Sequence, residues 1–427
     1  YLLRTETDPQ FVYMNMPDIN FDHAAAAPVL EQAREAMQEF LTQEYGNPSS
    51  LHRGGERPRQ ALETARARVA ALVSARPEEI VFTASGSESN NLAVKGLALA
   101  QMDKGRHIVV SAIEHASVLE SARSLKRLGF EVTEVPVDRN GSVQPDQLKA
   151  AIRPDTVLIS VMHANNEVGT IQNLMELTRT CRVHKVLFHS DGCAAVGRIP
   201  VDVAELGIDA YSFAAQSVYG PRGAAALYLR KGVTIRPLID GGFQERNRRA
   251  GTENVAAIAG FGVAAEFCRS HVDEWSRHLA RLGRRIQTEL PERLKHVVMT
   301  GCPDHRLPGH VSMCVEFVEG EAMLLSLDDA GIRAASGSSC TARNLKASHV
   351  LLAMGLPHAL AQSSLVLTLG KDSTDSDVDY FLEKLPPIVE RLRRMSPLYA
   401  RFERGEDPYQ TRLGEACEED EHANEES

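Results

Sequence analysis

The sequence lacks most of the features that mark special classes of protein. No apolar run approaches the roughly 20 residues that a membrane-spanning helix needs. An excess of positive charge is also absent, and a formal net charge of −10 argues against broad binding to nucleic acid or to anionic membranes. The first residues, YLLRTETDPQ, have neither the apolar core of a signal peptide nor the Arg- and Ser-rich character of a transit peptide. We therefore expect a globular protein that binds neither nucleic acid nor membrane.

Cysteine pairs with the spacing CxxC are missing as well. The seven cysteines are scattered, at positions 181, 193, 268, 302, 314, 340 and 417. An odd, unclustered set in a chain of this length predicts a reducing compartment, here the cytoplasm, and argues against a disulfide or zinc framework. We interpret six of them as buried small hydrophobes or bystanders. Cys340 differs because its loop, ASGSSCTARN, is built of small polar residues that leave a thiol accessible.

What the sequence does contain is an alternation of short apolar runs and helical patterns. The runs EIVFT, HIVVSAI, TVLISVMH, KVLFHSD and AALYL alternate with helical stretches such as ETARARVAALV. This alternation predicts an α/β protein with a mainly parallel sheet. From about Ala265 the pattern changes to long helices followed by short strands, which predicts a smaller α+β domain.

The predicted domains follow from this change of pattern. A large α/β domain is expected over residues 18–264 and a small α+β domain over 265–405. Residues 1–17 are expected to associate with the small domain or to be loose. The acidic tail, 406–427, ends in EACEEDEHANEES and has too little apolar surface to fold, so we predict that it is disordered.

Polar residues follow the predicted strands, at the edge of a parallel sheet where ligands bind. A buried Asp suits a protonated pyridine nitrogen, a His suits stacking on a ring, and a Ser at a helix start suits a phosphate. Their order predicts a pyridoxal phosphate (PLP) site. Taken singly, each also has a structural explanation, as a cap, a turn residue or a core histidine. The residues are Ser87, His115, Asn165, Asn166, Asp191 and Ser217.

Several longer segments carry a family resemblance. The sequence resembles the cysteine desulfurases, the NifS/IscS-like branch of the class V aminotransferases, over roughly residues 18–405. These proteins are fold-type I PLP enzymes, so the resemblance implies that architecture. The matching segments are INFDHAAAAPV, YGNPSSLH, EEIVFTASGSESNNLAVKG, MHANNEVGTIQ, FHSDGCAAVGRIPVD, YGPRGAAALY, RRAGTENV, ASGSSCTA and LRRMSPLYARFERG.

The resemblance implies a reaction and a set of roles. In such enzymes PLP forms an imine with a lysine and then with the substrate cysteine, and a loop cysteine attacks the substrate sulfur, giving alanine and an enzyme persulfide. It also implies a homodimer that passes sulfur to an acceptor or iron–sulfur scaffold protein. The implied roles are ring stacking for His115, the pyridine nitrogen for Asp191, the ring side for Asn166, the phosphate for Ser87, the neighbouring protomer's phosphate for Thr252, and the persulfide for Cys340.

The chain departs from the family pattern at the most important position. Aligning SFAAQSVYGPRG on its Tyr-Gly-Pro places Ser217 at the imine lysine, and serine cannot form an imine. The neighbouring Arg222 offers no substitute, because a guanidinium stays protonated. Four further positions also differ from the family. Gln216 replaces a histidine, Ala214 a phosphate-binding serine, Ala194 the glutamine on the PLP phenolic oxygen, and Val366 the arginine that binds the substrate carboxylate.

Two functions remain open on the sequence. In the first, the protein is a desulfurase-like pseudoenzyme of sulfur or iron–sulfur metabolism that acts as a scaffold or relays a persulfide through Cys340. In the second, it is an active cysteine desulfurase that holds PLP non-covalently or uses a lysine from another loop or a partner.

Overall fold

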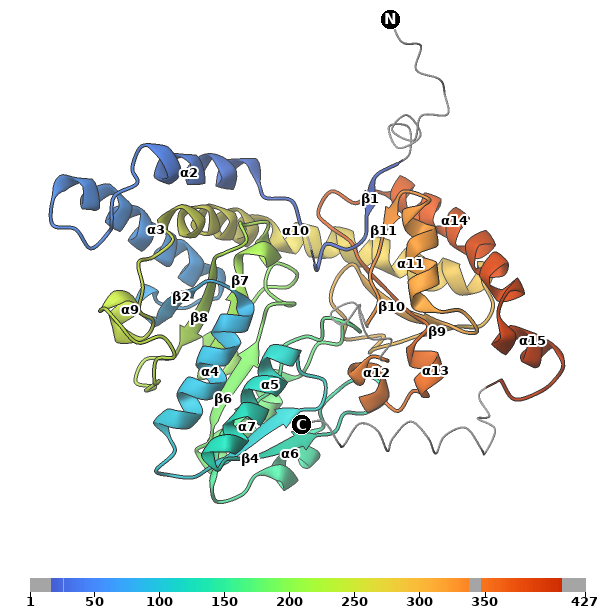
Figure 1. Cartoon of the computed structure of the whole chain (residues 1–427), viewed down its shortest axis with the longest axis horizontal. Coiled ribbons are helices and arrows are strands. Elements are labelled where there is room, and N and C mark those ends of the chain that lie inside the picture. The colour runs from blue at the N-terminus through green and yellow to red at the C-terminus, as the bar shows by residue number, and fades with distance from the viewer. Residues whose placement is uncertain (1–16, 26, 338–346, 409–427) are drawn as a thin grey trace, which may run out of the picture.

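The computed structural model describes residues 17–25, 27–337 and 347–408. It shows two lobes joined by one long helix (Figure 1). The Cys340 loop, most of the predicted acidic tail and most of the N-terminal segment lie outside the described residues.

A seven-stranded sheet forms the centre of the large lobe. The strand order is β2-β8-β7-β6-β5-β3-β4, and only β8 runs antiparallel to its neighbours. The prediction of an α/β fold with a mainly parallel sheet is therefore confirmed. The strands are β2 (Ile80–Thr83), β3 (His107–Ser111), β4 (Glu131–Val135), β5 (Thr156–Ser160), β6 (Leu187–Asp191), β7 (Ala210–Ala214) and β8 (Ala225–Leu229).

Helices cover both faces of this sheet (Figure 1). Helix α4 (Gly86–Ala100) begins where the Ser85 hydroxyl accepts the Glu88 N–H, and its apolar face packs on β5, β7 and β8. The other helical segments of this lobe are α2 (Glu31–Thr42), η1 (Arg53–Gly55), α3 (Glu56–Leu72), η2 (Pro77–Glu79), α5 (Ala116–Ser124), η3 (Leu125–Leu128), α6 (Pro145–Ala151), α7 (Leu174–His184), α8 (Val203–Leu206), η4 (Ala215–Val218) and α9 (Gln244–Asn247).

The small lobe is an α+β unit. Its antiparallel sheet has the order β12-β10-β9, and a second, two-stranded sheet pairs β1 with β11, so the N-terminal strand belongs to this lobe. Its strands are β1 (Ile19–Asn20), β9 (Val297–Met299), β10 (His310–Val315), β11 (Ile332–Arg333) and β12 (Ser364–Thr368). Its helices are α11 (Gly320–Asp328), α12 (His349–Ala353), α13 (His358–Ala361), α14 (Asp375–Arg394) and α15 (Pro397–Glu403).

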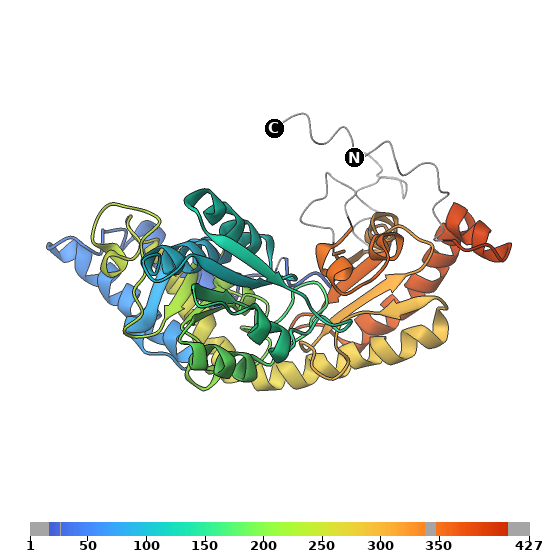
Figure 2. The ribbon, with the colours of Figure 1, turned by 90° about the horizontal axis from the view of Figure 1, so that it is seen from below.

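Helix α10 (Val255–Arg293) connects the two lobes along one side of the molecule (Figure 2). In the large lobe it packs against α2 and α3, and in the small lobe against α14 and β10. Glycine at 262 allows close approach, because a Cβ there would lie 2.6 Å from the Cα of Ala65. The predicted domain boundary at 264/265 falls inside this helix. Neither α10 nor any other helix of the described residues is long and apolar enough to cross a membrane.

Candidate functional site

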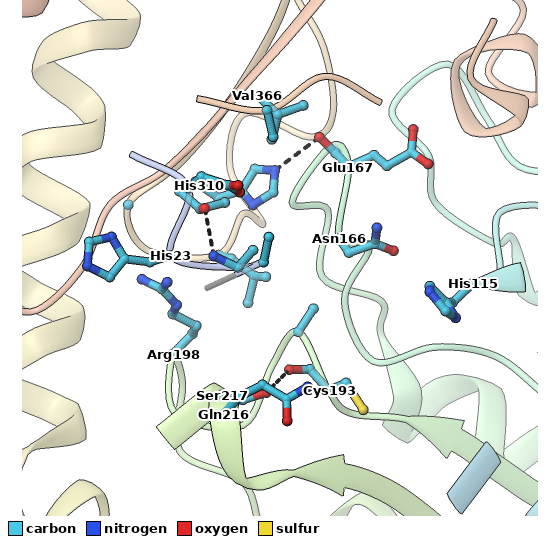
Figure 3. A pocket seen from close by; sticks show the side chains of 18 of the residues that line it. His23, His115, Asn166, Glu167, Cys193, Arg198, Gln216, Ser217, His310 and Val366 are labelled. Carbon is cyan, nitrogen blue, oxygen red and sulfur yellow. Dashed lines mark hydrogen bonds between the residues drawn. The ribbon is translucent and has the colours of Figure 1, made fainter. Parts of the chain in front are cut away.

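A cavity of about 260 Å³ lies between the two lobes. The large lobe contributes the segments that follow β3, β5, β6 and β7, at the carboxyl ends of its parallel strands. The small lobe contributes residues 307–310, 335–337 and part of β12, and residues 22–25 complete the wall. Side chains from both lobes therefore face one space (Figure 3).

The structure brings four of the predicted site residues to this cavity and leaves others outside its lining. His115, Asn166, Gln216 and Ser217 line it. Asp191 lies just behind the wall, where it is 5% exposed and accepts the N–H of the lining residue Cys193. Two others are exposed and outside the lining: Ser87, at the second position of α4, and Thr252, in the loop before α10. Cys340 lies outside the described residues.

A chain of hydrogen bonds connects Asp191 to His115. One carboxylate oxygen of Asp191 accepts from the Asn90 amide at 2.6 Å, and the same amide nitrogen donates to the Ser117 hydroxyl at 2.9 Å. That hydroxyl lies 2.7 Å from Nδ1 of His115, which also accepts the Ser117 N–H at 3.1 Å. Because Nδ1 accepts this N–H, it carries no proton, and the hydroxyl donates to it. Sequence reasoning missed Asn90 and Ser117, although Asn90 lies within one of the segments that carry the resemblance and Ser117 follows His115 by two residues.

Two glutamates with raised pKa values lie in the segments that carry His115 and Asn166. Glu114 is fully buried, and burial raises its pKa to about 8; its Oε1 accepts from the Ser111 hydroxyl and from the Met162 N–H. Its Oε2 has no partner among the described residues, which fits a protonated carboxyl. Glu167 lines the cavity, where burial raises its pKa to about 7 and the Ser348 hydroxyl donates to it. Sequence reasoning did not single out either residue.

Ser217 occupies a short 3₁₀ turn, η4, that follows the end of β7. Tyr219 closes this turn in the left-handed conformation, with φ at 61°. The Ser217 hydroxyl donates to the Cys193 carbonyl at 2.7 Å. No lysine is among the described residues that line the cavity. The nearby Lys371 lies over the Tyr219 ring and pairs with Asp372, outside the lining.

Cys193 is a cavity residue that the sequence analysis had placed among the bystander cysteines. Its side chain is partly exposed, and a Cβ on Gly86 would come within 2.6 Å of its sulfur. Burial, together with the nearby Asp191 carboxylate, raises the pKa of this thiol well above its usual value. Cys193 is therefore a neutral thiol near neutral pH and a poor nucleophile.

The opposite part of the cavity contains a cation and an apolar side chain. Arg198, in the loop after β6, donates from Nη1 to the Leu369 carbonyl. Val366 lies in the middle of β12 and is 5% exposed. Figure 3 shows the two side chains entering the cavity from different sides.

Sequence and structure comparisons identify the relatives of this fold and site. A family profile described as aminotransferase class-V matches residues 19–381. The cysteine desulfurase IscS of Dictyoglomus turgidum is 46% identical over 380 residues, which cover 89% of this chain and 96% of that protein. The corresponding IscS of Methanosarcina thermophila is 45% identical over 392 residues, covering 92% of this chain and 95% of its own length.

Solved structures agree with these relatives. A NifS-like protein superposes with a TM-score of 0.83 at 35% identity, covering 88% of this chain and all of that one. The NifS-like protein of Rickettsia africae gives a TM-score of 0.79 at 30% identity, with the same coverage. The chain belongs to the cysteine desulfurases. Within the class V aminotransferases, this desulfurase branch is the family that the motifs had indicated, and the fold-type I architecture is confirmed. PLP is the cofactor of this family.

Proposed function

We propose that the protein is a cysteine desulfurase-like pseudoenzyme that acts in sulfur or iron–sulfur metabolism as a scaffold or a persulfide relay through Cys340. The observation that carries this proposal is Ser217. At the position of the family's imine lysine the cavity has a hydroxyl bonded to a backbone carbonyl, and no lysine of the described residues replaces it.

The residues of the cavity fit PLP only in part. Asp191, the residue implied to hold the pyridine nitrogen, is buried and held in place by the Asn90 amide and the Cys193 N–H. The Oδ1 atom of Asn90 is buried with no partner among the described residues, which leaves one acceptor beside Asp191 unsatisfied. Bound PLP would supply an electron sink for the substrate's amino-acid carbon. The covalent anchor and the carboxylate clamp are missing, because Ser217 and Val366 provide neither an amine nor a charge.

A persulfide relay needs only a thiolate at Cys340. The thiolate would attack the outer sulfur of a donor persulfide, forming a new S–S bond, while the donor's own S–S bond breaks and the donor leaves as a thiolate. No oxidant or reductant is consumed. The competing thiols are poorly suited to this exchange, because burial raises the pKa values of Cys181, Cys268 and Cys314 to about 12.

The absence of a covalent cofactor is tested by an absorption spectrum of the purified protein before and after addition of PLP and borohydride. We expect no visible band and no PLP fixed by reduction, together with no sulfide release from cysteine. A stable yellow adduct mapped by mass spectrometry to any lysine would contradict the proposal.

The relay is tested separately from the cofactor. A limiting alkylating agent, or a small persulfide donor, is added to the native protein, and the modified cysteines are mapped by mass spectrometry. We expect Cys340 to react first. If another cysteine of the folded domains reacts while Cys340 stays unmodified, the relay hypothesis is refuted and only the scaffold function is left.

The second candidate function is an active desulfurase, converting cysteine to alanine and an enzyme persulfide, with PLP bound non-covalently. The observation in its favour is the intact hydrogen-bond chain from Asp191 to His115. It predicts a PLP-dependent visible band that dialysis removes, accompanied by sulfide release, whereas the pseudoenzyme gives neither.

A further inference from the structure

Arg198 is a cation for which the described part of the chain offers no counterion. Among the described residues its guanidinium makes one hydrogen bond, to the Leu369 carbonyl. None of the described Asp and Glu side chains lies within ion-pair distance of it, although most other arginines of comparable burial, such as Arg66 and Arg249, have such partners. Burial lowers the pKa of Arg198, and no carboxylate is among the groups that raise this pKa. A half-buried charge of this kind is costly unless a counterion compensates it.

The groups around Arg198 do not supply that compensation. His23 is its neighbour on the wall, and burial together with the charge of Arg198 lowers the pKa of His23 to about 4, so the imidazole is neutral. The buried Nδ1 of His23 has no partner among the described residues. The carboxyls of Asp22 and Glu167 line the same cavity, and burial raises the pKa values of both.

The cavity lining also has an apolar part. It includes Val366, Leu307, Pro308 and Ala335, which offer no charge. Arg198 is the only lysine or arginine among the described residues of the lining. The cavity, at about 260 Å³, has room for a short carbon chain with a single anionic end.

We propose that Arg198 is the anchor of a binding site for a small organic carboxylate, held without a covalent bond in the cavity between the lobes. A guanidinium has a planar fork of donors that matches a carboxylate, and only Nη1 of the Arg198 guanidinium donates to a side chain or backbone group of the described residues. The apolar residues accommodate the carbon chain of the ligand. The carboxylate therefore sits on a different wall from Val366. The proposal of this site rests on the proposed function in one respect: Ser217 offers no amine that could bind a ligand covalently.

Calorimetric titration of the full chain, without PLP and in a chloride-free buffer, tests the site. The probes are propionate, the neutral isostere propionamide, and sulfate as an inorganic anion. We expect saturable binding of propionate, with propionamide and sulfate each at least about tenfold weaker, because charge-assisted hydrogen bonds need both the charge and the planar geometry. Equal binding of propionamide would overturn the proposal without any variant. Tighter binding of sulfate would overturn the choice of a carboxylate.

Variants then assign the binding to Arg198. Arg198→Met should weaken propionate at least about tenfold, whereas Arg198→Lys, which keeps the charge and a donor for the Leu369 carbonyl, should lose less. Arg222→Met is the matched control, because Arg222 is exposed and outside the cavity lining. Thermal unfolding checks that each variant is folded. Unchanged propionate affinity in a folded Arg198→Met protein would refute the assignment.

These outcomes are independent of those for the proposed function. A covalent PLP adduct would contradict the pseudoenzyme and leave the carboxylate titration unaffected, since no PLP is present in it. Absence of propionate binding would remove the site and leave the spectrum and the sulfide assay unchanged.

Discussion

The chemistry of the cavity is decided by single atoms at a few positions. A hydroxyl at position 217 satisfies its hydrogen bond within the protein, at the Cys193 carbonyl, and carries no charge. If this position corresponds to the family's imine lysine, as the resemblance implies, serine offers neither the nucleophilic amine nor the positive charge that a lysine would bring to the cavity lining.

Restoring the amine should restore only the first step of the family's chemistry. In Ser217→Lys we expect PLP to be fixed by borohydride but sulfide release to stay near background, because Val366 still leaves the substrate carboxylate without its family partner. Adding Val366→Arg should then raise sulfide release by at least about tenfold, the contribution of a charge-assisted carboxylate contact. Ser217→Met, which adds length without an amine, is the control. Full turnover in Ser217→Lys alone would show that position 366 is unimportant.

The buried carboxyl of Glu114 should make stability depend on pH. Its pKa is about 8 in the folded protein and near the model-compound value of 4.5 in the unfolded chain. Between these values the folded state holds a proton that the unfolded state has released. The stabilising contribution is therefore complete below pH 4.5 and is lost as the pH rises to about 8.

Glu114→Gln should remove this dependence. Denaturant unfolding at pH 5.5, 6.5 and 7.5 should give a free energy of unfolding whose fall with pH is shallower than in the unchanged protein, by about 1.4 kcal/mol per pH unit. Glu35→Gln, on the exposed face of α2, should leave the slope as it is. An identical slope in Glu114→Gln and the unchanged protein would mean that Glu114 is ionised when buried.

At this scale the sequence predicted some residues of the site and missed others. His115, Asn166 and Ser217 follow strands of a parallel sheet, and that position alone brings them to the cavity. His310 could not be found in this way, because it belongs to the small lobe and does not follow a strand of the parallel sheet. Arg198 does follow β6, but seven residues after the strand ends, and was missed. Cys193 was also missed, since its neighbour Asp191 explained the segment on its own.

Among the secondary-structure elements, α3 and α9 are joined by a buried ion pair. Arg66 and Glu245 are bonded through two nitrogens at 2.8 Å, with side chains that are 7% and 2% exposed. The Glu245 carboxylate also accepts the N–H of Phe82, and its backbone is in the left-handed region with φ at 46°. This pair fixes the loop that precedes α10 to the edge of the sheet.

Breaking the pair should be costly. Arg66→Met leaves the Glu245 carboxylate buried without a counterion, and we expect the free energy of unfolding to fall by about 3–5 kcal/mol. Arg57→Met, at the half-exposed pair with Glu39 between α3 and α2, should cost no more than about 1 kcal/mol. Chemical denaturation of both variants gives the comparison. Similar losses in the two would show that burial of the Arg66 pair has no energetic consequence.

Most strands of the large lobe could be predicted from the sequence. Runs such as TVLISVMH and AALYL became β5 and β8 because continuous apolar residues suit strands covered on both faces. The direction of β8 could not be predicted, since an antiparallel central strand has the same composition as a parallel one. The length of α10 could not be predicted either. Its first turns consist of small apolar residues and its later turns are amphipathic, and this change of pattern had suggested a domain boundary.

The assembled molecule should be a homodimer. Four large apolar side chains of the described residues are at least 80% exposed: Tyr45 at 80%, Leu51 at 97% and Phe243 at 87%, and on α7 Val183 at 81%. Phe243 lines one further cavity together with Ser49, which lies in the loop that carries Tyr45 and Leu51, so these three exposed side chains belong to neighbouring loops. A surface of this kind marks an interaction site.

Light scattering should therefore give the mass of two chains. The double change Leu51→Asp and Phe243→Asp should shift the population toward a monomer, because charges placed in an apolar interface stay unpaired. Val183→Asp, at another exposed apolar side chain on α7, should not. A monomer in the unchanged protein would refute the homodimer.

Helix α10 has a mechanical consequence for access to the cavity. Its 39 residues form one uninterrupted span between the lobes, a rod of about 58 Å at the usual rise per residue. A rod anchored by packing at both ends resists hinge bending, so the lobes cannot open like a clamshell without breaking helical hydrogen bonds. We therefore expect a molecule to enter and leave through the rim of the cavity, whose lining includes residues 22–25 and 335–337. Changes along that rim should alter the rates of association and dissociation together while leaving the equilibrium affinity nearly the same.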